Sequence, residues 1–343
     1  MATRVLVVIP TLNEASTIAR VLSDLGQDLP SDASTTLVVA DGGSTDGTID
    51  IVGHIQSQAV DLHLMPNPRR IQAAAVNEAV RQFGRGVDVL VRCDAHALYP
   101  PGFVRRLIET LERTGADSVV VPMDSVGESC LQKAVAWVSD TPVGSGGSAH
   151  RGGRRSGFVD HGHHAVFRMD RFRRAGGYDE TFTHNEDAEF DCRQRALGAR
   201  IYLDAEIRLA YRPRATFGGL WRQYFAYGRG RYRTVRRHPR SVRARQLALP
   251  AQLALTALAV IGALWTPLFL WWPALYLALL SSTSMLLAMR HRSVCGLLSG
   301  PAAFVMHTAW ALGFYWGLLS VREQLWRPEA AAALWIDSPV GDS

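Results

Sequence analysis

The sequence predicts an α/β protein with a doubly wound, mostly parallel sheet, followed by transmembrane helices near the carboxyl terminus. Three observations support this fold class. Short β-branched runs alternate with segments of helical spacing over the first half of the chain. Acidic residues follow two of these runs, at the edge where such sheets bind ligands. Residues 247–289 contain no Asp, Glu, Lys, Arg or His, and this length suffices for two membrane-spanning helices.

The predicted strands and helices alternate along the chain. Each strand is a short apolar run, and each helix begins after a turn rich in Gly, Asp, Asn or Ser. Such alternation is typical of right-handed crossovers between parallel strands. We expect strands at 4–10, 35–40, 60–65, 87–92 and 118–122, and helices at 15–25, through Val52 and Ile55, and at 70–83, 102–113 and 188–197.

The apolar C-terminal part follows an arginine-rich stretch, 207–246, that contains no acid. Arginines that flank a first span mark the cytoplasmic side, so we expect an inner (cytoplasmic) membrane protein whose N-terminal domain faces the cytoplasm. Helices at about 247–264 and 268–289 would form a pair of spans. A third apolar stretch at 297–319 either crosses fully or is a re-entrant or interfacial segment. No nucleic-acid motif accompanies the arginines, so we expect no nucleic-acid partner.

The resulting organisation has four parts. We expect a cytoplasmic domain at 1–235, a basic juxtamembrane segment at 236–246, a membrane domain at 247–321 and a tail at 322–343. The cysteines are far apart in the sequence, which favours reduced thiols over a disulfide framework or a zinc site. They are Cys93, Cys130, Cys192 and Cys295.

Asp41 directly follows the second predicted strand and precedes Gly42 and Gly43. A carboxylate in this position can accept hydrogen bonds from a ribose or a base N–H, and the glycines let a ligand approach the backbone. The alternative is an ordinary Asp-Gly turn. Asp46, further along, is expected to cap the next helix.

Asp94 and His96 follow the fourth predicted strand. Two ligands separated by one residue, on the turn that leaves a strand, can reach one divalent cation that neutralises a diphosphate leaving group. Histidine is a softer ligand than carboxylate and accepts Mn²⁺ as well as Mg²⁺. A single Asp-x-His is a weak pattern, and Asp41 on a neighbouring strand strengthens the prediction.

Glu186 and Asp187 begin a predicted helix after a Gly-Gly-Tyr-Asp-Glu segment at 176–180. The helix dipole favours an ionised carboxylate in the first turn, and a general base must be ionised. We expect Asp187 to be the catalytic base, with Glu186 as the competitor for that role. The alternative is a plain acidic helix terminus that Asn185 caps.

Together these motifs resemble glycosyltransferase family 2 over most of residues 4–233. In chain order they are IPTLNE at 9–14, ADGGSTDGT at 40–48, DAH at 94–96 with Pro100, and GYDE at 177–180 before Glu186 and Asp187. Within the family the sequence looks like the ExoA-like branch of bacterial exopolysaccharide (succinoglycan) biosynthesis. That resemblance rests on GHHAVF at 162–167, on QYFAYGRGR at 223–231 and on the apolar C-terminal part.

The resemblance implies a GT-A (Rossmann-like) fold and inverting transfer of a sugar from a nucleotide sugar, most often a UDP-sugar. It also implies a Mg²⁺ or Mn²⁺ cofactor, although His96 replaces the usual second aspartate of the metal motif. The Gln-x-x-Arg-Trp signature of processive synthases is not matched, which favours transfer of a single sugar. By position, Asp187 would be the base, Asp94 and His96 would hold the metal, and the nucleotide sugar would contact Pro10, Thr11, Leu12, Glu14, Asp41, Gly43 and Asp94.

The expected acceptor is an undecaprenyl-type, lipid-linked saccharide at the membrane. Candidates to contact it or its phosphate are His163, His164, Arg229 and Arg231, although structural histidines and arginines that only orient the spans are the alternatives. Two other functions remain open. One is a polyprenyl-phosphate glycosyltransferase, and the other is a non-catalytic membrane scaffold or sugar sensor. The sequence does not indicate the oligomeric state.

Overall fold

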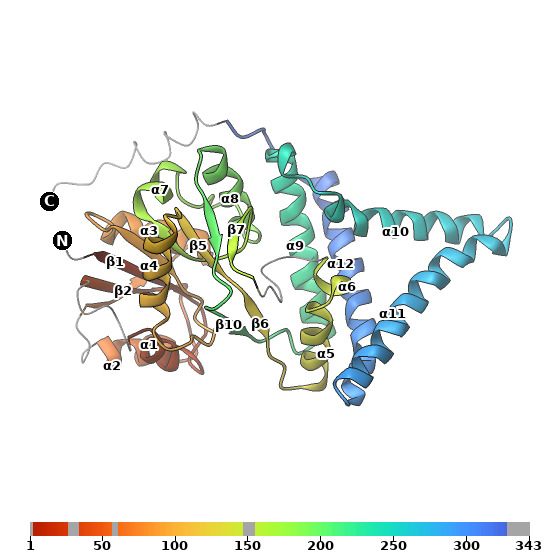
Figure 1. The fold of residues 1–343 in the computed structure, drawn as a ribbon, viewed down its shortest axis with the longest axis horizontal. Coiled ribbons are helices and arrows are strands. Elements are labelled where there is room, and N and C mark those ends of the chain that lie inside the picture. Colours follow the sequence, from red (N-terminus) through yellow and green to blue (C-terminus); the bar gives the residue numbers. More distant parts are fainter. Residues whose placement is uncertain (1–2, 27–33, 57–60, 147–154, 328–343) are drawn as a thin grey trace. The chain divides into compact units, whose positions relative to one another are not determined.

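The computed structural model describes residues 3–26, 34–56, 61–146 and 155–327 (Figure 1). The chain divides into two compact units. Unit 1 comprises Met1–Met123, Gly153–Tyr211 and Trp326–Ser343, whereas unit 2 comprises Asp124–Gly152 and Arg212–Leu325. A segment of unit 2 is therefore inserted in the sequence of unit 1.

Unit 1 is built on an eight-stranded sheet with the order β3-β2-β1-β4-β8-β5-β9-β7. The strands from β3 to β4 are parallel, as the alternation of strands and helices predicts. The other half is mixed, because β8 is antiparallel to both its neighbours and β7 is antiparallel to β9. The strands are β1 (Arg4–Thr11), β2 (Ser34–Asp41), β3 (Leu62–Pro66), β4 (Val89–Arg92), β5 (Ser118–Val121), β7 (Gly157–Val159), β8 (His163–Arg168) and β9 (Ile201–Leu203).

Both faces of this sheet are covered. Alternate residues of β1 point to opposite sides, so Val7 and Ile9 belong to one hydrophobic core while Leu6 and Val8 belong to the other. Helices α1, α2 and α4 contribute to the first core, and α3, α7 and α8 contribute to the second. The helices are α1 (Ile18–Gly26), α2 (Thr48–Gln56), α3 (Gln72–Phe83), α4 (Phe103–Thr114), α7 (Met169–Arg174) and α8 (Glu186–Ala196).

Strand β8 was not predicted from the sequence. It is short and begins with two histidines, which gives it no regular apolar pattern. In the sheet it lies between β4 and β5, with Val166 in one core and Phe167 in the other. Because β8 is antiparallel to β4, its first residue, His163, lies at the carboxyl end of β4.

Unit 2 is helical, and Figure 1 shows α9 and α12 side by side, with α10 and α11 as a hairpin that leads away from them. Three of its segments are long and apolar enough to cross a membrane: Ala244–Gly262, Pro267–Arg290 and Val294–Ser320. Two short strands, β6 (Met123–Ser125) and β10 (Leu209–Tyr211), lie where the chain passes between units. The helices are α5 (Cys130–Ser139), α6 (Pro142–Ser145), α9 (Phe217–Arg237), α10 (Ala244–Gly262), α11 (Trp271–Arg290) and α12 (Ser299–Ser320).

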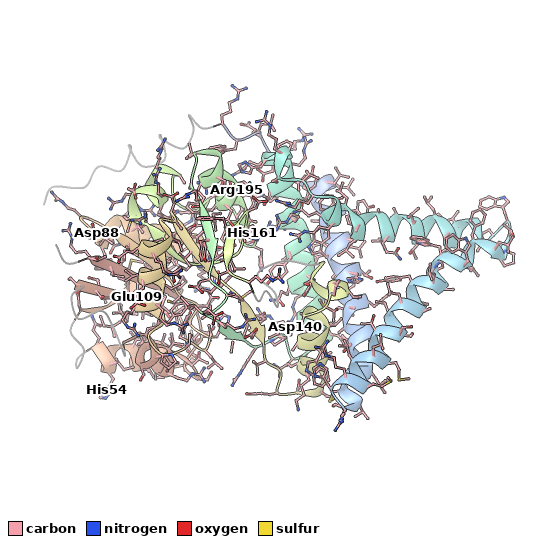
Figure 2. The ribbon with its side chains drawn as sticks, viewed as in Figure 1. His54, Asp88, Glu109, Asp140, His161 and Arg195 are labelled. Atoms are coloured by element: carbon pink, nitrogen blue, oxygen red, sulfur yellow. A yellow bond between two sulfur atoms is a disulfide. The ribbon has the colours of Figure 1, made fainter. Side chains whose placement is uncertain are left out.

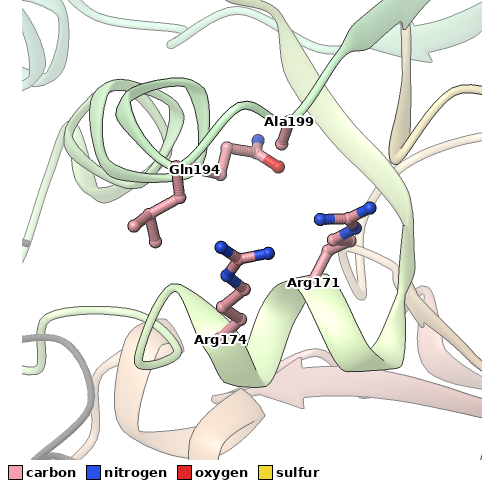
Figure 3. Close-up of a pocket in the computed structure, with 5 residues that line it drawn as sticks. Arg171, Arg174, Gln194 and Ala199 are labelled. Carbon is pink, nitrogen blue, oxygen red and sulfur yellow. The ribbon is translucent and has the colours of Figure 1, made fainter.

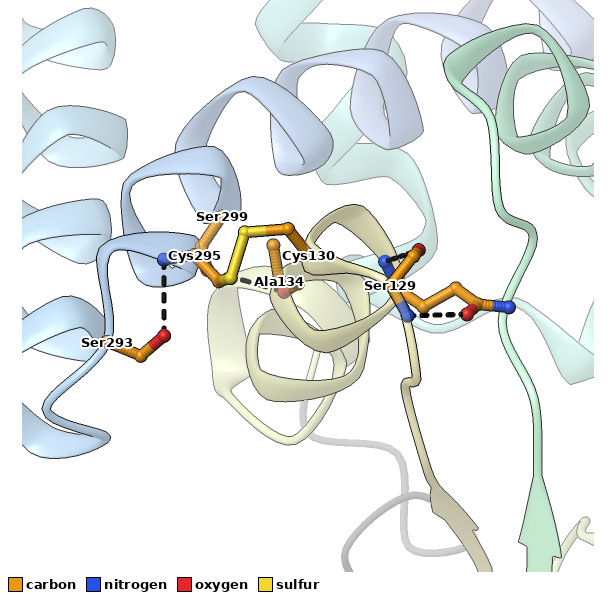
Figure 4. Close-up of a disulfide and its surroundings, with 7 residues drawn as sticks. Ser129, Cys130, Ala134, Ser293, Cys295 and Ser299 are labelled. Atoms are coloured by element: carbon orange, nitrogen blue, oxygen red, sulfur yellow. Dashed lines mark hydrogen bonds between the residues drawn. A yellow bond between two sulfur atoms is a disulfide. The ribbon is translucent and has the colours of Figure 1, made fainter.

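The expectation that all cysteines are free is wrong. Cys130, the first residue of α5, forms a disulfide with Cys295, in the link between α11 and α12, and their Cα atoms are 5.0 Å apart (Figure 4). The two cysteines are separated by 165 positions, so their spacing in the sequence carries no signal. Only the packing of α5 against the start of α12 brings them together. Neither Cys93 nor Cys192 is part of a disulfide.

Candidate active site

Arg92 is the last residue of β4 and is 4 % exposed. Its Nη2 lies 3.2 Å from Glu186 Oε1, and its Nη1 forms an ion pair with Asp187. Nη2 also donates to Gln72 Oε1 at 2.6 Å and lies 3.9 Å from Asp94 Oδ1. One buried arginine therefore connects the predicted metal motif with the predicted base.

His163 connects the same two motifs through its ring nitrogens. Nε2 lies 3.4 Å from Asp94 Oδ2, and Nδ1 lies 3.8 Å from Asp187 Oδ2. This histidine is on β8, which lies between Asp94 and Asp187 in the sequence. The structure thus brings Asp94, His163 and Asp187 together, as one cluster around Arg92.

The environment of this cluster separates the pKa values of its carboxyl groups. Burial opposes ionisation of Asp94, but the hydrogen bond and charge of His163, with the charges of Arg92 and His96, hold its pKa well below the usual range. Burial and the charge of Asp187 raise the pKa of Glu186 to about 7, although Arg92 opposes this. Near neutral pH, Asp94 is therefore ionised, whereas Glu186 loses its proton much less readily than an ordinary glutamate.

The Gly-Tyr-Asp-Glu motif supports the cluster. Asn77 of α3 donates to Tyr178 O at 2.8 Å, and its own Oδ1 accepts from Tyr178 N at 2.9 Å. Asn77 also donates to Glu180 Oε1 at 2.9 Å. The buried ring of Tyr178 contacts Phe172 edge-on, and the Arg92 guanidinium carbon lies 5.4 Å from the centre of that ring. The motif therefore holds Arg92 in position.

Asp41 ends β2 directly beside Thr11, which ends β1. Its Oδ1 accepts from the backbone N–H groups of Gly43 and Ser44 at 2.8 Å each, and its Oδ2 accepts from the Ser44 hydroxyl at 2.6 Å. These bonds close the turn, as in the alternative interpretation. Since a carboxylate has about four acceptor positions, one position is left for a ligand.

The loop after β1 is bonded to this turn. Asn13, whose φ is 56°, donates its N–H to Ser44 Oγ at 2.8 Å and accepts from Thr45 N at 2.9 Å. Glu14 N donates to Thr48 Oγ1 at 2.9 Å. The first two sequence motifs therefore form one hydrogen-bonded unit at the carboxyl ends of β1 and β2.

An arginine that the sequence analysis did not assign lies beside this unit. A methyl group added at Gly43 would come within 3.3 Å of Arg70 Nη2, and one added at Gly42 would come within 3.3 Å of Leu12 Cδ1. Arg70 and Leu12 are exposed, whereas Pro10 is buried. An exposed guanidinium next to a glycine turn suits a phosphate.

The predicted metal ligands are only partly arranged for an ion. His96 Nδ1 lies 3.0 Å from Glu14 Oε1, so two predicted residues contact each other. Asp94 Oδ1 is buried and accepts no hydrogen bond from the described residues. A cation would satisfy this oxygen, so Asp94 fits the predicted metal. No group of three or more His, Cys, Asp or Glu residues that could hold an ion occurs in the part of the chain that the structure describes.

The remaining predicted residues are on β8 and α9. His164 follows His163 in β8. Arg229 and Arg231 lie on α9 of unit 2, where Arg229 is exposed and Arg231 is half-buried. Asn185 occupies the N-cap position of α8, as in the alternative interpretation, with φ 69° and without a side-chain capping hydrogen bond to the helix.

The later acids of α8 have partners outside the cluster. Asp191 Oδ2 lies 2.5 Å from Nδ1 of His161, a residue labelled in Figure 2, and its Oδ1 accepts from Gln194 at 2.8 Å. Glu189 forms a buried ion pair with Arg193 at 2.8 Å. Only the first two acids of α8 contact Arg92.

A small hollow lies between α7 and the end of α8 (Figure 3). It encloses practically no space that a water molecule could enter, so it is not a ligand pocket. None of the residues predicted to bind substrate or metal lines it. The lining residues are Arg171, Arg174, Gln194, Leu197 and Ala199.

Comparison with known proteins gives consistent results. The sequence profile of Glycosyl transferase family 2 matches residues 6–176. The chain is 41% identical over 324 residues to the succinoglycan biosynthesis protein ExoA of Rhizobium meliloti (strain 1021), which covers 94% of this chain and 98% of that protein. It is 23% identical over 240 residues to a dolichyl N-acetyl-alpha-D-glucosaminyl phosphate 3-beta-D-2,3-diacetamido-2,3-dideoxy-beta-D-glucuronosyltransferase of Methanococcus voltae, covering 67% of this chain and 74% of that protein.

A solved structure has a similar fold. The mannosyltransferase PcManGT from Pyrobaculum calidifontis superposes with a TM-score of 0.62 and 21% sequence identity, covering 94% of this chain and 89% of that chain. The sheet order and this superposition define a GT-A fold, and the relatives described above are glycosyltransferases or proteins of succinoglycan biosynthesis. The chain belongs to glycosyltransferase family 2, and the similarity to ExoA extends over nearly its whole length.

Proposed function

We propose that this glycosyltransferase transfers a single sugar, with inversion, from a nucleotide sugar to a lipid-linked saccharide during assembly of an exopolysaccharide or cell-envelope glycan. The observation that carries the proposal is the cluster around Arg92. It holds Asp94, expected on the donor diphosphate, and Asp187, expected under the acceptor hydroxyl, in contact with one guanidinium.

On the donor side, the hydrogen-bonded unit formed by the first two motifs would bind the nucleoside. Asp41 has an acceptor position free for a ribose or base donor, and Gly43 leaves room for close approach. Arg70 would bind the diphosphate. We expect the donor to be a UDP-sugar. A Mg²⁺ or Mn²⁺ ion on Asp94 and His96 would neutralise charge on the departing diphosphate.

On the acceptor side, Asp187 would accept the proton of the acceptor hydroxyl as that oxygen attacks the anomeric carbon. The new bond joins the acceptor oxygen to the sugar, and the bond from the sugar to the diphosphate breaks with its electron pair, which releases a nucleoside diphosphate. Arg92 holds the base in place, and the more deeply buried Glu186 holds Arg92.

The proposed acceptor is carried by an undecaprenyl-type lipid in the inner membrane, with the catalytic residues on the cytoplasmic side. The arginines that precede α10 support this orientation. The relative from Methanococcus voltae supports a lipid-linked acceptor, since its name describes transfer to a sugar on dolichyl phosphate. We propose that His163, His164, Arg229 and Arg231 contact the acceptor or its phosphate.

The decisive experiment compares Asp187→Asn with the unmodified enzyme. This change preserves the shape of the side chain and removes its basicity, so turnover should fall by roughly 10²–10⁴-fold while donor binding persists. Turnover is measured as nucleoside diphosphate release with a lipid-linked acceptor fraction, and donor binding is measured by calorimetry.

Glu186→Gln is the matched control because it alters the neighbouring carboxyl group. If Glu186→Gln abolishes turnover and Asp187→Asn does not, the base is Glu186. If both variants remain active, the acceptor is already ionised, and a polyprenyl-phosphate glycosyltransferase replaces the present proposal. If no donor and acceptor pair reacts, the protein is a scaffold or sensor.

A second prediction concerns the metal. UDP binding should weaken when a chelator removes divalent ions, and Asp94→Ala should remove most of this dependence because Asp94 carries the unsatisfied oxygen. Calorimetry with and without Mg²⁺ or Mn²⁺ measures both effects. His96→Asp is the control, since it restores a second carboxylate and should retain the dependence. Equal UDP affinity with and without chelator in the unmodified enzyme would exclude the metal role.

A further inference from the structure

Helix α12 is attached to other parts of unit 2 along its whole length. Before its start, Cys295 is bonded to Cys130 of α5. At its first residue, the Ser299 hydroxyl donates to Ala134 O at 3.3 Å. Near its middle, His307 Nε2 lies 2.7 Å from Val143 O. Helices α5 and α6, which follow β6 in the sequence, therefore contact the first half of α12.

Ion pairs connect the segment after α12 to α9. Glu323, three residues beyond the helix, has a side chain that is only 5% exposed. It forms an ion pair with Arg233 and another with Arg237, whose Nη2 lies 2.8 Å from Glu323 Oε2. A buried carboxylate held by two arginines fixes the end of α12 at the level of the last turn of α9.

Between these points, α9 and α12 are in close backbone contact. A methyl group added at Gly228 of α9 would lie 1.9 Å from Trp310 O, and one added at Gly313 of α12 would lie 2.0 Å from Phe225 O. The Tyr232 ring contacts the Phe314 ring edge-on at 5.5 Å. The two helices therefore run in the same direction. At a membrane they would lie at the same depth in the bilayer.

This depth cannot be the bilayer core, because α9 is strongly basic. An arginine at the centre of a spanning helix costs about 2.5–3.5 kcal/mol even on scales measured by insertion. If α12 crossed the membrane, α9 would have to cross beside it with all its arginines. They are Arg222, Arg229, Arg231, Arg233, Arg236 and Arg237.

Helices α10 and α11 also contact α12, through Gly300 N to Ser284 Oγ at 2.7 Å and Tyr315 OH to Pro250 O at 2.7 Å, but they are much less buried than α12. In their apolar windows only 11% and 22% of residues are buried within the protein, against 44% for α12. Large apolar side chains at the tip of the hairpin are strongly exposed, including Leu264 (82%), Trp265 (78%) and Leu268 (76%). Figure 1 shows α10 leading away from the α9 and α12 pair and α11 returning from the hairpin tip to the start of α12.

We infer that the α10–α11 hairpin alone crosses the bilayer, and that α12 lies with α9 at the membrane surface. At 1.5 Å per residue, α10 and α11 each match a hydrocarbon core of about 30 Å. The exposed face of α12, which includes Phe304 and Trp316, contacts the lipid interface, while the exposed arginines of α9, Arg222, Arg229 and Arg236, meet anionic head groups. The end of α12 is then on the same side of the membrane as unit 1.

The test is the sidedness of single added cysteines in the full chain. Leu325→Cys reports the segment after α12, Leu264→Cys reports the hairpin tip, and Asp170→Cys reports unit 1. All three side chains are exposed, by 64%, 82% and 75% respectively, so the variants should fold. Each is treated with a membrane-impermeant maleimide in sealed inverted and in sealed right-side-out vesicles, and the unmodified chain corrects for Cys192.

The expected result is that Leu325→Cys and Asp170→Cys react in the same preparation and lose labelling in the other, whereas Leu264→Cys shows the opposite pattern. Leu325→Cys reacting together with Leu264→Cys would show that α12 crosses and would overturn the inference. Reaction of all three in one preparation would overturn the crossing by the hairpin. The labelling does not depend on sugar transfer, so this outcome is independent of the proposed reaction.

Discussion

Arg92 is surrounded by carboxylates that have little access to water, and its removal would leave them without a cation. Replacing one partner of a buried ion pair costs about 3–5 kcal/mol, because the remaining charge stays buried. We expect Arg92→Met to lower the free energy of unfolding of unit 1 by about this amount, measured by urea denaturation in detergent.

Arg105 provides the matched control. It pairs with Glu109 at 2.7 Å on α4, and both side chains are about half exposed. Exposed pairs of this type contribute about 1 kcal/mol or less, so Arg105→Met should change the stability little. Equal losses in the two variants would contradict a central role for Arg92.

The raised pKa of Glu186 predicts a pH dependence of stability. Its pKa is about 7 in the folded protein and near 4.5 when unperturbed, so the folded state binds a proton that the unfolded state has released between these values. This contribution to stability is complete below pH 4.5 and is lost as the pH rises through about 7. Relative to the unmodified protein, Glu186→Gln should lack this fall, which urea midpoints at several pH values would reveal. If the stability of the unmodified protein and of Glu186→Gln changed with pH in the same way, the raised pKa of Glu186 would be contradicted.

The residues of this cluster differ in how far the sequence predicts them. Asp94 and Asp187 stand in motifs next to predicted elements, so a local pattern identifies them. Arg92 follows three apolar residues of a buried strand, and this position indicates a buried cation. His163 reaches the cluster because β8 lies between β4 and β5. This position depends on pairing between distant segments, which a local pattern cannot predict.

Among the elements, the pair formed by α9 and α12 depends on glycines at the contact. Gly228→Ala and Gly313→Ala would each force the backbones apart, since the added methyl groups would overlap carbonyl oxygens. Overpacking of this kind costs about 1–3 kcal/mol or more. We expect both variants to lower the thermal midpoint in detergent.

Gly218→Ala is the control in the same helix. A methyl group there would have no neighbour within 4 Å. Alanine is a better helix former than glycine by up to about 1 kcal/mol, so this variant should be neutral or stabilising. If all three variants behave alike, close approach of the two helices is not what the glycines provide.

For the whole molecule, the α/β class, the parallel half of the sheet and the apolar helices follow from periodicity and composition. The relation of α12 to α9 does not, because length and hydropathy are similar for a spanning helix and for one packed on protein. The insertion of residues 124–152 of unit 2 between segments of unit 1 also has no local signal. It follows from contacts such as the disulfide between Cys130 and Cys295.

That disulfide makes the stretch from residue 130 to residue 295 a covalent ring. A protease site introduced after Trp265, at the hairpin tip, would open the ring without dividing the molecule. On a denaturing gel the cut protein should migrate as one species until a thiol reductant is added, and then as two fragments. In extracts alkylated at lysis and run without reductant, the ratio of the undivided band to the two fragment bands reports the fraction of the protein that carries the disulfide inside the cell.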